Sequence, residues 1–322
     1  MTNPDPHPDS SRASDCPARP DHPVIERIKA RTSTLGQGLT IRRALPARAR
    51  RMIGAWCFFD HAGPMSYEAG QGISVGPHPH IGLQTFSWMV EGRMRHSDSL
   101  GNNAWIEPGQ VNLMTAGRGI SHAEESDPER PGRLQLAQLW IALPDAYRHC
   151  EPAFVNYPDL PVSHRGGMEL TLLVGEHGDR VSPVRVHSPL LAMDIRASAA
   201  DQTTLALEPG FEYGLMVLEG RAQVDKETFE PGELAYLGTG RTLLDLGVER
   251  DGRVLLIGGE PFEEDILLWW NFVARNPEEI EQAAADWQSG QRFGTVDAAA
   301  SPPLSMPSLE AVRLRADQRR SE

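Results

Sequence analysis

Three things are scarce in this sequence, and each scarcity excludes a class of protein. The chain has 3 cysteines, Cys16, Cys57 and Cys150. Their number is odd and their spacings are unrelated, so they predict free thiols rather than a disulfide framework or a C-x-x-C metal or redox motif. No apolar run approaches the roughly eighteen residues of a membrane-spanning helix, so no such helix is expected.

Positive charge is the third scarcity. The chain has 31 Lys and Arg residues against 44 Asp and Glu residues, a formal net charge of −13. Direct binding to nucleic acid or to an anionic membrane needs a basic surface that releases counterions. We therefore expect neither, and any effect on transcription would act through a protein partner. The first residues also lack the basic and apolar regions of a secretion signal, which favours a cytoplasmic protein.

The residues that are abundant indicate a globular protein built from many short elements. Hydrophobic residues make up 40% of the 322 positions and charged residues 23%, with 30 glycines and 26 prolines. Short apolar runs such as TFSWMVEG, ELTLLVG and EYGLMVLEG alternate with turn residues, which is typical of β-strands. We predict an all-β fold. Residues 1–23 and 297–322 have segments rich in Pro, Ser and Ala or Asp, and they are expected to be mobile tails.

An internal repeat divides the region between these tails. In each copy a strand ends in Glu-Gly, a hairpin leads to a Glu-Pro-Gly turn, and a third glycine follows. The marker glycines are Gly92, Gly109 and Gly117 in the first copy, and Gly220, Gly232 and Gly240 in the second. Repeated hairpins and turns of this spacing predict two small β-barrels or jelly rolls. We expect an N-terminal barrel domain over 24–160 and a C-terminal one over 161–296.

One helix is predicted near the C-terminus. Asn276 is a suitable N-cap, Pro277 occupies the first helical position, and two glutamates follow it. Ile280, the alanines after it and Trp287 recur at helical spacing until Gly290. This apolar stripe is expected to pack on a barrel.

Two pairs of residues at i, i+2 spacing predict a metal site. His78 and His80 lie one residue apart in GPHPHIGLQT (residues 76–85), and His122 and Glu124 repeat the spacing in GRGISHAE (residues 117–124). In extended chain each pair projects to one side. If the intervening chain is the hairpin and return strand of one barrel, three imidazoles and a carboxylate converge. Continuing the phase of the two histidines along the chain predicts a pocket floor made by Gln84, Phe86, Trp88 and Val90.

Imidazole nitrogens and one carboxylate suit a divalent first-row metal. Fe(II) is favoured for oxygen chemistry, while Mn, Ni, Cu and Co accept the same ligand types. Either pair alone is compatible with a polar turn or a solvated strand end. The second copy of the repeat is an internal control, because its equivalent positions carry no such set: Ala206, Glu208, Asp245 and Gly247. The turns therefore do not require these ligands, and the first barrel alone is expected to hold metal.

Four motifs together resemble the pirin family of the cupin superfamily. They are FDHAGPM (59–65), the HPHIGLQT run (78–85), MRHSDSLG (94–101) and MTAGRGISHAE (114–124), and the resemblance extends from about residue 40 to Arg-Phe-Gly294. It implies a bicupin with a mononuclear iron in the N-terminal barrel, bound by His78, His80, His122 and Glu124. Cupins in general carry a glutamate where this chain has Gln84; in the pirin pattern that position is not a ligand, so Gln84 would shape the pocket or hold a water.

The resemblance also implies an activity. Bacterial pirin-like proteins are associated with quercetin 2,3-dioxygenase activity, in which O₂ cleaves a metal-bound flavonol. A Lewis-acidic ion would lower the pKa of the flavonol hydroxyl, and Glu124 would be a ligand, or would also act as the catalytic base. The alternative, from another class, is a non-enzymatic regulator whose iron reports redox state to a protein partner, as in animal members.

Other conspicuous residues have a structural interpretation first. His61 is expected to be a hydrogen-bonded structural residue, His96 and Asp98 a polar strand end or turn that could border the pocket mouth, and Arg118 either a buried anchor or a partner of Glu124 or an anionic substrate. Large aromatics are expected in the core: Trp88, Trp105, Trp140, Trp269, Trp270 and Phe272. No role is expected for the remaining histidines: His7, His22, His149, His164, His177 and His187.

Overall fold

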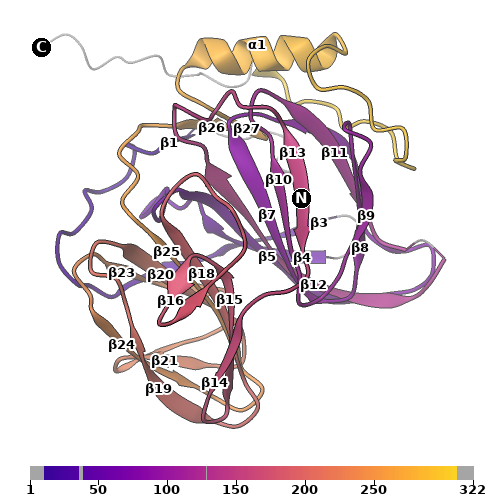
Figure 1. Ribbon diagram of the computed structural model, residues 1–322. Coiled ribbons are helices and arrows are strands. Elements are labelled where there is room, and N and C mark those ends of the chain that lie inside the picture. The colour runs from indigo at the N-terminus through magenta and orange to yellow at the C-terminus, as the bar shows by residue number, and fades with distance from the viewer. Residues whose placement is uncertain (1–10, 36–38, 128, 310–322) are drawn as a thin grey trace, which may run out of the picture.

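The computed structural model describes residues 11–35, 39–127 and 129–309 (Figure 1). This part of the chain contains 27 strands and one α-helix. Most strands form two barrels, each of which pairs a seven-stranded sheet with a four-stranded sheet. The all-β fold with two barrels and a short C-terminal helix is therefore confirmed. The outer parts of both predicted tails, with His7, lie outside the described residues.

The first barrel contains the chain from β3 to β13. Its seven-stranded sheet has the order β13-β10-β7-β12-β5-β4-β3. The bounds are β3 Arg31–Leu35, β4 Leu39–Leu45, β5 Trp56–Tyr67, β7 Leu83–Glu91, β10 Val111–Thr115, β12 Gly132–Ala142 and β13 Ala153–Tyr157. The opposing four-stranded sheet has the order β6-β11-β8-β9. Its bounds are β6 Ser74–His80, β8 Met94–Asp98, β9 Asn103–Ile106 and β11 Ile120–Glu125.

The second barrel repeats this plan. Its seven-stranded sheet has the order β14-β15-β18-β25-β20-β23-β2 and its four-stranded sheet the order β19-β24-β21-β22. The bounds are β2 Glu26–Lys29, β14 Val162–Arg165, β15 Met168–Val174, β18 Leu190–Ala197, β19 Asp201–Ala206, β20 Glu212–Glu219, β21 Ala222–Val224, β22 Glu227–Phe229, β23 Glu233–Gly238, β24 Leu243–Val248 and β25 Arg253–Gly259. A small hairpin joins β16 Glu176–His177 to β17 Arg180–Val181.

The two seven-stranded sheets pack against each other and bury the largest apolar cluster. Trp56, Phe86 and Trp88 of the first barrel share this cluster with Leu255 and Ile257 of the second. The indole Nε1 of Trp56 donates a hydrogen bond of 3.1 Å to the Gly258 carbonyl oxygen. Burial of this much apolar surface fixes the barrels relative to each other.

The repeat seen in the sequence corresponds to matching turns in the two barrels. Gly92 and Gly220 follow β7 and β20, and both have a positive φ, 82° and 66°. At Gly92 a Cβ atom would lie 1.9 Å from the carbonyl oxygen of Arg133. Glycine is therefore required there for both conformation and space.

The interior of the second barrel is apolar. Leu205, Leu244 and Leu246 belong to its core cluster. Ala206 and Asp245, two of the positions equivalent to the histidines and glutamate of the first barrel, are exposed instead. Strand residues alternate between faces, so the leucines occupy the inner face that would have to carry metal ligands.

The C-terminal elements cover one end of the first barrel. A three-stranded sheet has the order β1-β26-β27, with bounds β1 Ser11–Arg12, β26 Leu267–Trp269 and β27 Phe272–Ala274. Helix α1, Pro277–Gln288, begins after Asn276, whose side chain accepts from the Glu279 amide, as predicted. Ile280 of the helix packs with Trp269, Trp270 and Phe272. Figure 1 shows the helix lying across the upper end of the first barrel.

The chain between residues 11 and 29 is tied to the C-terminal sheet and to the second barrel, which differs from the predicted domain limits. Strand β2 pairs with β23, so residues 26–29 extend the second barrel although the first was predicted to begin at 24. Residues 11–23 were predicted to be a mobile tail, yet β1 pairs with β26. The carbonyl oxygen of Pro20 also accepts from Thr239. Short polar segments can be held by backbone pairing that composition does not reveal.

The other predicted tail is also held in its described part. The amides of Ala300 and Ser301 donate to the Glu125 carboxylate at 2.9 and 3.1 Å. The Leu304 amide donates to the Pro77 carbonyl oxygen at 2.8 Å. Residues 300–304 are therefore held against β6 and β11, contrary to the prediction of a flexible segment.

Two further expectations concern cysteine and membranes. Cys57 is buried, Cys16 and Cys150 are half-buried, and all three are free thiols, as predicted. Burial raises the pKa of Cys57 to about 12, so its thiol is inert at neutral pH. In the described part of the chain, no helix has the length and apolar character needed to cross a bilayer.

Candidate metal centre

The candidate metal site lies on the four-stranded sheet of the first barrel. Strand β11 runs between β6 and β8. His122 of β11 lies opposite His78 of β6. Directly opposite residues of neighbouring strands share a face, and so do residues two apart in one strand. His78, His80 and His122 therefore face one another, as the sequence predicted.

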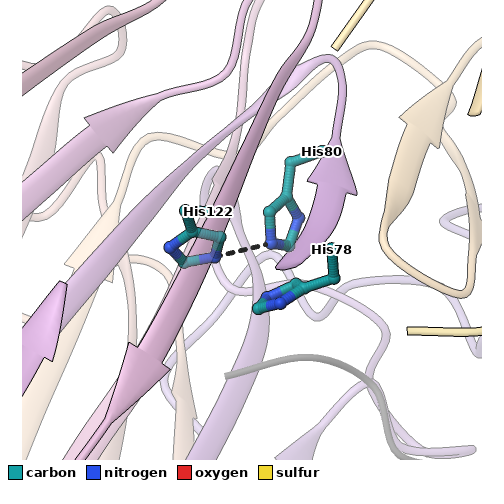
Figure 2. Close-up of side chains that lie close together, drawn as sticks. All are labelled: His78, His80 and His122. Atoms are coloured by element: carbon teal, nitrogen blue, oxygen red, sulfur yellow. Dashed lines mark hydrogen bonds between the residues drawn. The ribbon is translucent and has the colours of Figure 1, made fainter. Parts of the chain in front are cut away.

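The three imidazoles form one compact group (Figure 2). A ligand nitrogen from each lies within 4.8 Å of those of the other two. The ring centroids of His78 and His122 are 4.3 Å apart, and those of His80 and His122 are 5.0 Å apart. All three side chains are buried.

Backbone carbonyl groups set the tautomers of two of these histidines. Nδ1 of His78 lies 2.9 Å from the Gly76 carbonyl oxygen, and Nδ1 of His80 lies 3.0 Å from that of Asn271. A carbonyl oxygen only accepts, so each Nδ1 carries the proton and each Nε2 has a free lone pair. His78 Nε2 is buried and has no hydrogen-bond partner among the described residues. His80 Nε2 faces His122 Nε2 at 3.2 Å.

Burial keeps these imidazoles neutral. It lowers the pKa of His78 to about 4 and, together with the neighbouring imidazoles, lowers the pKa values of His80 and His122 well below the usual 6.5. Neutral imidazole is the form that binds a metal. A buried lone pair without a donor, such as that on His78 Nε2 within the described part of the chain, is costly, and a divalent cation among the three rings would remove that cost. The donor set therefore fits a transition metal.

Glu124 is buried on the same strand, two residues beyond His122. The pairing of β11 with β6 shifts register between His122 and Glu124, which is the mark of a β-bulge. Bulges re-aim side chains next to functional sites. The group with ligand atoms within 4.8 Å consists of the three histidines, and the role of Glu124 as fourth ligand stays a prediction.

Comparison with known proteins places this architecture. Residues 38–141 match the family description Pirin, and residues 192–294 match the Pirin C-terminal cupin domain. The chain is 50% identical over 310 residues to a Pseudomonas aeruginosa protein named "Putative quercetin 2,3-dioxygenase PA1205", covering 96% of this chain and 98% of that protein. The chain belongs to the pirin family.

Solved structures agree with this assignment. A structure titled quercetin 2,3-dioxygenase, from Acinetobacter baumannii, is 50% identical with a TM-score of 0.86, covering 88% of this chain and 95% of that one. An Escherichia coli bacterial pirin solved in complex with nickel(II) has the same fold at 21% identity and a TM-score of 0.59, covering 74% of this chain and 100% of that one. The predicted bicupin architecture is that of pirins.

The predicted pocket floor of this pirin is wrong. Phe86 and Trp88 lie in the cluster between the barrels, not beside the histidines. The reason is that β6 and β7 belong to different sheets, and Gly82, with φ 68°, turns the chain between them. The phase of side chains along one strand cannot be continued through such a turn.

Aromatic rings from the opposite sheet lie next to the histidines instead. The Trp140 ring makes an edge contact with His80 at a centroid distance of 5.2 Å. Phe58 stacks on Trp140 at 3.9 Å. These rings come from β12 and β5, so the apolar wall of the metal site is built by the seven-stranded sheet that faces the histidine strands.

Polar side chains lie on the same inner face as Trp140 and Phe58. Each is two residues along its strand from the level of these aromatic rings. Ser87 pairs with Gln138, and Gln138 with Asp60. The Ser87 hydroxyl donates 2.8 Å to the Gln138 side-chain oxygen. The side-chain nitrogens of Gln138 and Asn112 are buried and have no hydrogen-bond partner among the described residues. These amides are donors available to the oxygen atoms of a bound molecule or water.

Three of the other predicted residues lie away from the metal site. Arg118 is half-exposed and pairs with Glu151 at 2.8 Å, so it is neither a buried anchor nor a partner of Glu124. Trp105 is 36% exposed, with the Arg93 guanidinium over its ring, and is not in the core. Gln84, on β7, donates a hydrogen bond of 2.9 Å to the hydroxyl group of Thr115, on β10.

His96 and Asp98 are functional candidates that were interpreted from the sequence as structural first. They were expected to form a polar strand end or turn that could border the pocket mouth. Asp98 is indeed the last residue of β8, and both side chains are buried beside His122. Nδ1 of His96 lies 3.3 Å from Nδ1 of His122. Their i, i+2 spacing matches that of the two predicted ligand pairs, and this signal could have identified them.

The burial of His61 is expected to make the free energy of unfolding depend on pH. Gln135 Nε2 donates 3.0 Å to His61 Nε2, and burial, followed by the charge of Arg42, lowers the pKa of His61 to about 3 from 6.5. Between these values the unfolded chain binds a proton that the native protein excludes, so stability falls as pH decreases through this range. As pH decreases through this range, a His61→Leu variant is expected to lose less free energy of unfolding than wild type does. The difference is up to about 1.4 kcal/mol per pH unit.

The measurement is denaturant unfolding of metal-free protein between pH 7 and pH 4. The exposed His164 offers a matched control, His164→Leu. Equal pH slopes for wild type and His61→Leu would contradict a neutral buried His61.

Proposed function

We propose that this pirin is a metal-dependent dioxygenase that cleaves a flavonol in the manner of quercetin 2,3-dioxygenase. The observation that carries the proposal is the buried group of three histidines, two of which have their Nδ1 atoms bound to backbone carbonyl groups. The 50% identity with a structure titled quercetin 2,3-dioxygenase supports the substrate class.

Fe(II) is the metal that we propose, held by His78, His80, His122 and Glu124. Bound Fe(II) would supply Lewis acidity, which lowers the pKa of a flavonol hydroxyl, and redox access to O₂. Mn, Ni, Cu and Co suit the same donors, so metal identity is a separate measurement. Trp140, whose ring contacts His80, and Phe58, which stacks on Trp140, are fully buried and form an apolar wall beside this site.

Two residue sets would act on the substrate itself. Glu124 would accept the proton of the flavonol hydroxyl, because it is buried and two residues from His122 on the same strand. Gln138 and Asn112 would donate hydrogen bonds to flavonol oxygens from the opposite sheet. An aromatic, oxygen-rich molecule matches a surface that combines aromatic rings with amide donors.

The test is aerobic incubation of iron-loaded protein with quercetin. Loss of the flavonol absorbance and release of carbon monoxide are the expected results, and neither is expected from metal-free protein. Retained absorbance with about one equivalent of bound iron would reject the flavonol proposal and favour the regulator acting through a protein partner.

A further inference from the structure

His122 differs from the other two histidines in how its ring is held. His78 and His80 each donate Nδ1–H to a backbone carbonyl group, whereas the Nδ1 of His122 faces another imidazole, that of His96, at 3.3 Å. Figure 2 shows the second ring nitrogen of His122 pointing away from His78 and His80. An imidazole partner can donate or accept, so the tautomer of His122 depends on that of His96.

Asp98 determines the tautomer of His96. Its Oδ2 atom lies 3.0 Å from His96 Nε2. Its Oδ1 atom accepts from the amides of Leu100 and Asn102 at 2.9 and 3.0 Å, and both oxygens accept from the Asn102 side chain. A carboxylate surrounded by donors in this way acts only as an acceptor. His96 Nε2 must therefore carry a proton.

The position of each proton in the series Asp98, His96 and His122 follows from the residue before it. A neutral His96 with its proton on Nε2 has a lone pair on Nδ1, which accepts from His122 Nδ1–H. The Nε2 lone pair of His122 then faces the Nε2 lone pair of His80 at 3.2 Å, the contact marked by the dashed line in Figure 2, so both nitrogens are acceptors inside the candidate metal site. The His96 ring is also stacked on Phe154, with centroids 4.1 Å apart and an interplanar angle of 8°. Ring position and tautomer are thus both set from outside the metal site.

We infer that His96 and Asp98 are positioning residues that hold His122 in the tautomer able to bind metal through Nε2. The inference rests on the proposed metal site, though not on the identity of the substrate. Partners that orient ligating histidines typically contribute about 10- to 100-fold to metal affinity.

Asp98→Asn is the decisive substitution because it keeps the size and changes one acceptor into a donor. The three donors around Oδ1 require the amide oxygen there, so the new NH₂ group faces His96 Nε2. His96 then accepts at Nε2 and donates from Nδ1. His122 accepts at Nδ1 and carries its proton on Nε2, the atom needed for the metal.

The expected result is a loss of about 10- to 100-fold in Zn(II) affinity, measured on the full-length chain by competition with a chromophoric chelator. Asp245→Asn, on an exposed site of the second barrel, is the matched control and is expected to leave the affinity unchanged. Zn(II) affinity within about twofold of wild type in Asp98→Asn would overturn the inference.

Nitrogen-15 NMR of the imidazoles in metal-free protein reports the tautomer directly. Wild type is expected to carry the His122 proton on Nδ1, and Asp98→Asn is expected to carry it on Nε2. A purely structural role of Asp98 would not move this proton. If wild type already has the proton on Nε2, the inference is wrong, whether or not the variant folds. Neither readout depends on quercetin turnover, so failure of the proposed activity is recognised separately.

Discussion

Replacing His122 with alanine is expected to remove about one equivalent of metal from the purified protein and to abolish flavonol cleavage. Structural zinc sites contribute about 10–16 kcal/mol of apparent binding free energy, so an equal share for one of four ligands is about 3 kcal/mol. That share corresponds to about two orders of magnitude in metal affinity. The loss extends to catalysis, because the proposed reaction needs the metal to bind the flavonol.

Metal content is best measured on protein purified without a chelating tag. His164→Ala is the matched control, since His164 is exposed on β14 of the second barrel. Thermal unfolding of both variants separates loss of the ligand from loss of the fold. An unchanged metal content in His122→Ala would refute the site.

Replacing Glu124 with glutamine is expected to lower turnover by about 10²- to 10⁴-fold, the usual contribution of a general base. Glutamine keeps the size of the buried side chain and an oxygen able to bind metal, but it has lost the basic carboxylate. The decrease should therefore lie mainly in kcat. Metal content measured on the same samples distinguishes the base from a ligand-only role.

The outcomes separate cleanly. A Glu124→Gln variant with full iron and full turnover would exclude the base. Reduced turnover in proportion to reduced iron would indicate a ligand alone. Glu125→Gln is a neighbouring control, because the Glu125 carboxylate accepts from the Ala300 and Ser301 amides and lies outside the three-histidine group.

Strand and turn chemistry made the architecture predictable from the sequence. Marker glycines such as Gly92 and Gly220 recur because their turns need positive φ, and alternating apolar runs between them specify strands. The sequence signal of the C-terminal helix was equally local, since Asn276 and Pro277 act within its first turn. The three histidines could be predicted for the same reason. His78 and His80, like His122 and Glu124, lie two residues apart in one strand and so share a face.

Features that depend on which strands become neighbours were not predictable. The sequence placed Phe86 in the pocket, but the change of sheet after Gly82 directs it to the barrel interface and brings Trp140 to His80 instead. Composition suggested mobile tails, although strand pairing holds residues 11–12, and hydrogen bonds to the Glu125 carboxylate and the Pro77 carbonyl oxygen hold residues 300–304.

By itself, then, the sequence determined the two barrels, the barrel that carries the histidines and the identity of those histidines. His78 is held locally, by the carbonyl group of Gly76, whereas only the tertiary structure decided what holds the other two. His80 donates to Asn271, 191 residues away, and His122 faces His96 from the neighbouring strand. Ligand type and spacing are local properties of a strand. For His80 and His122, tautomer and ring orientation are set by partners in other segments, and these exist only once the chain has folded.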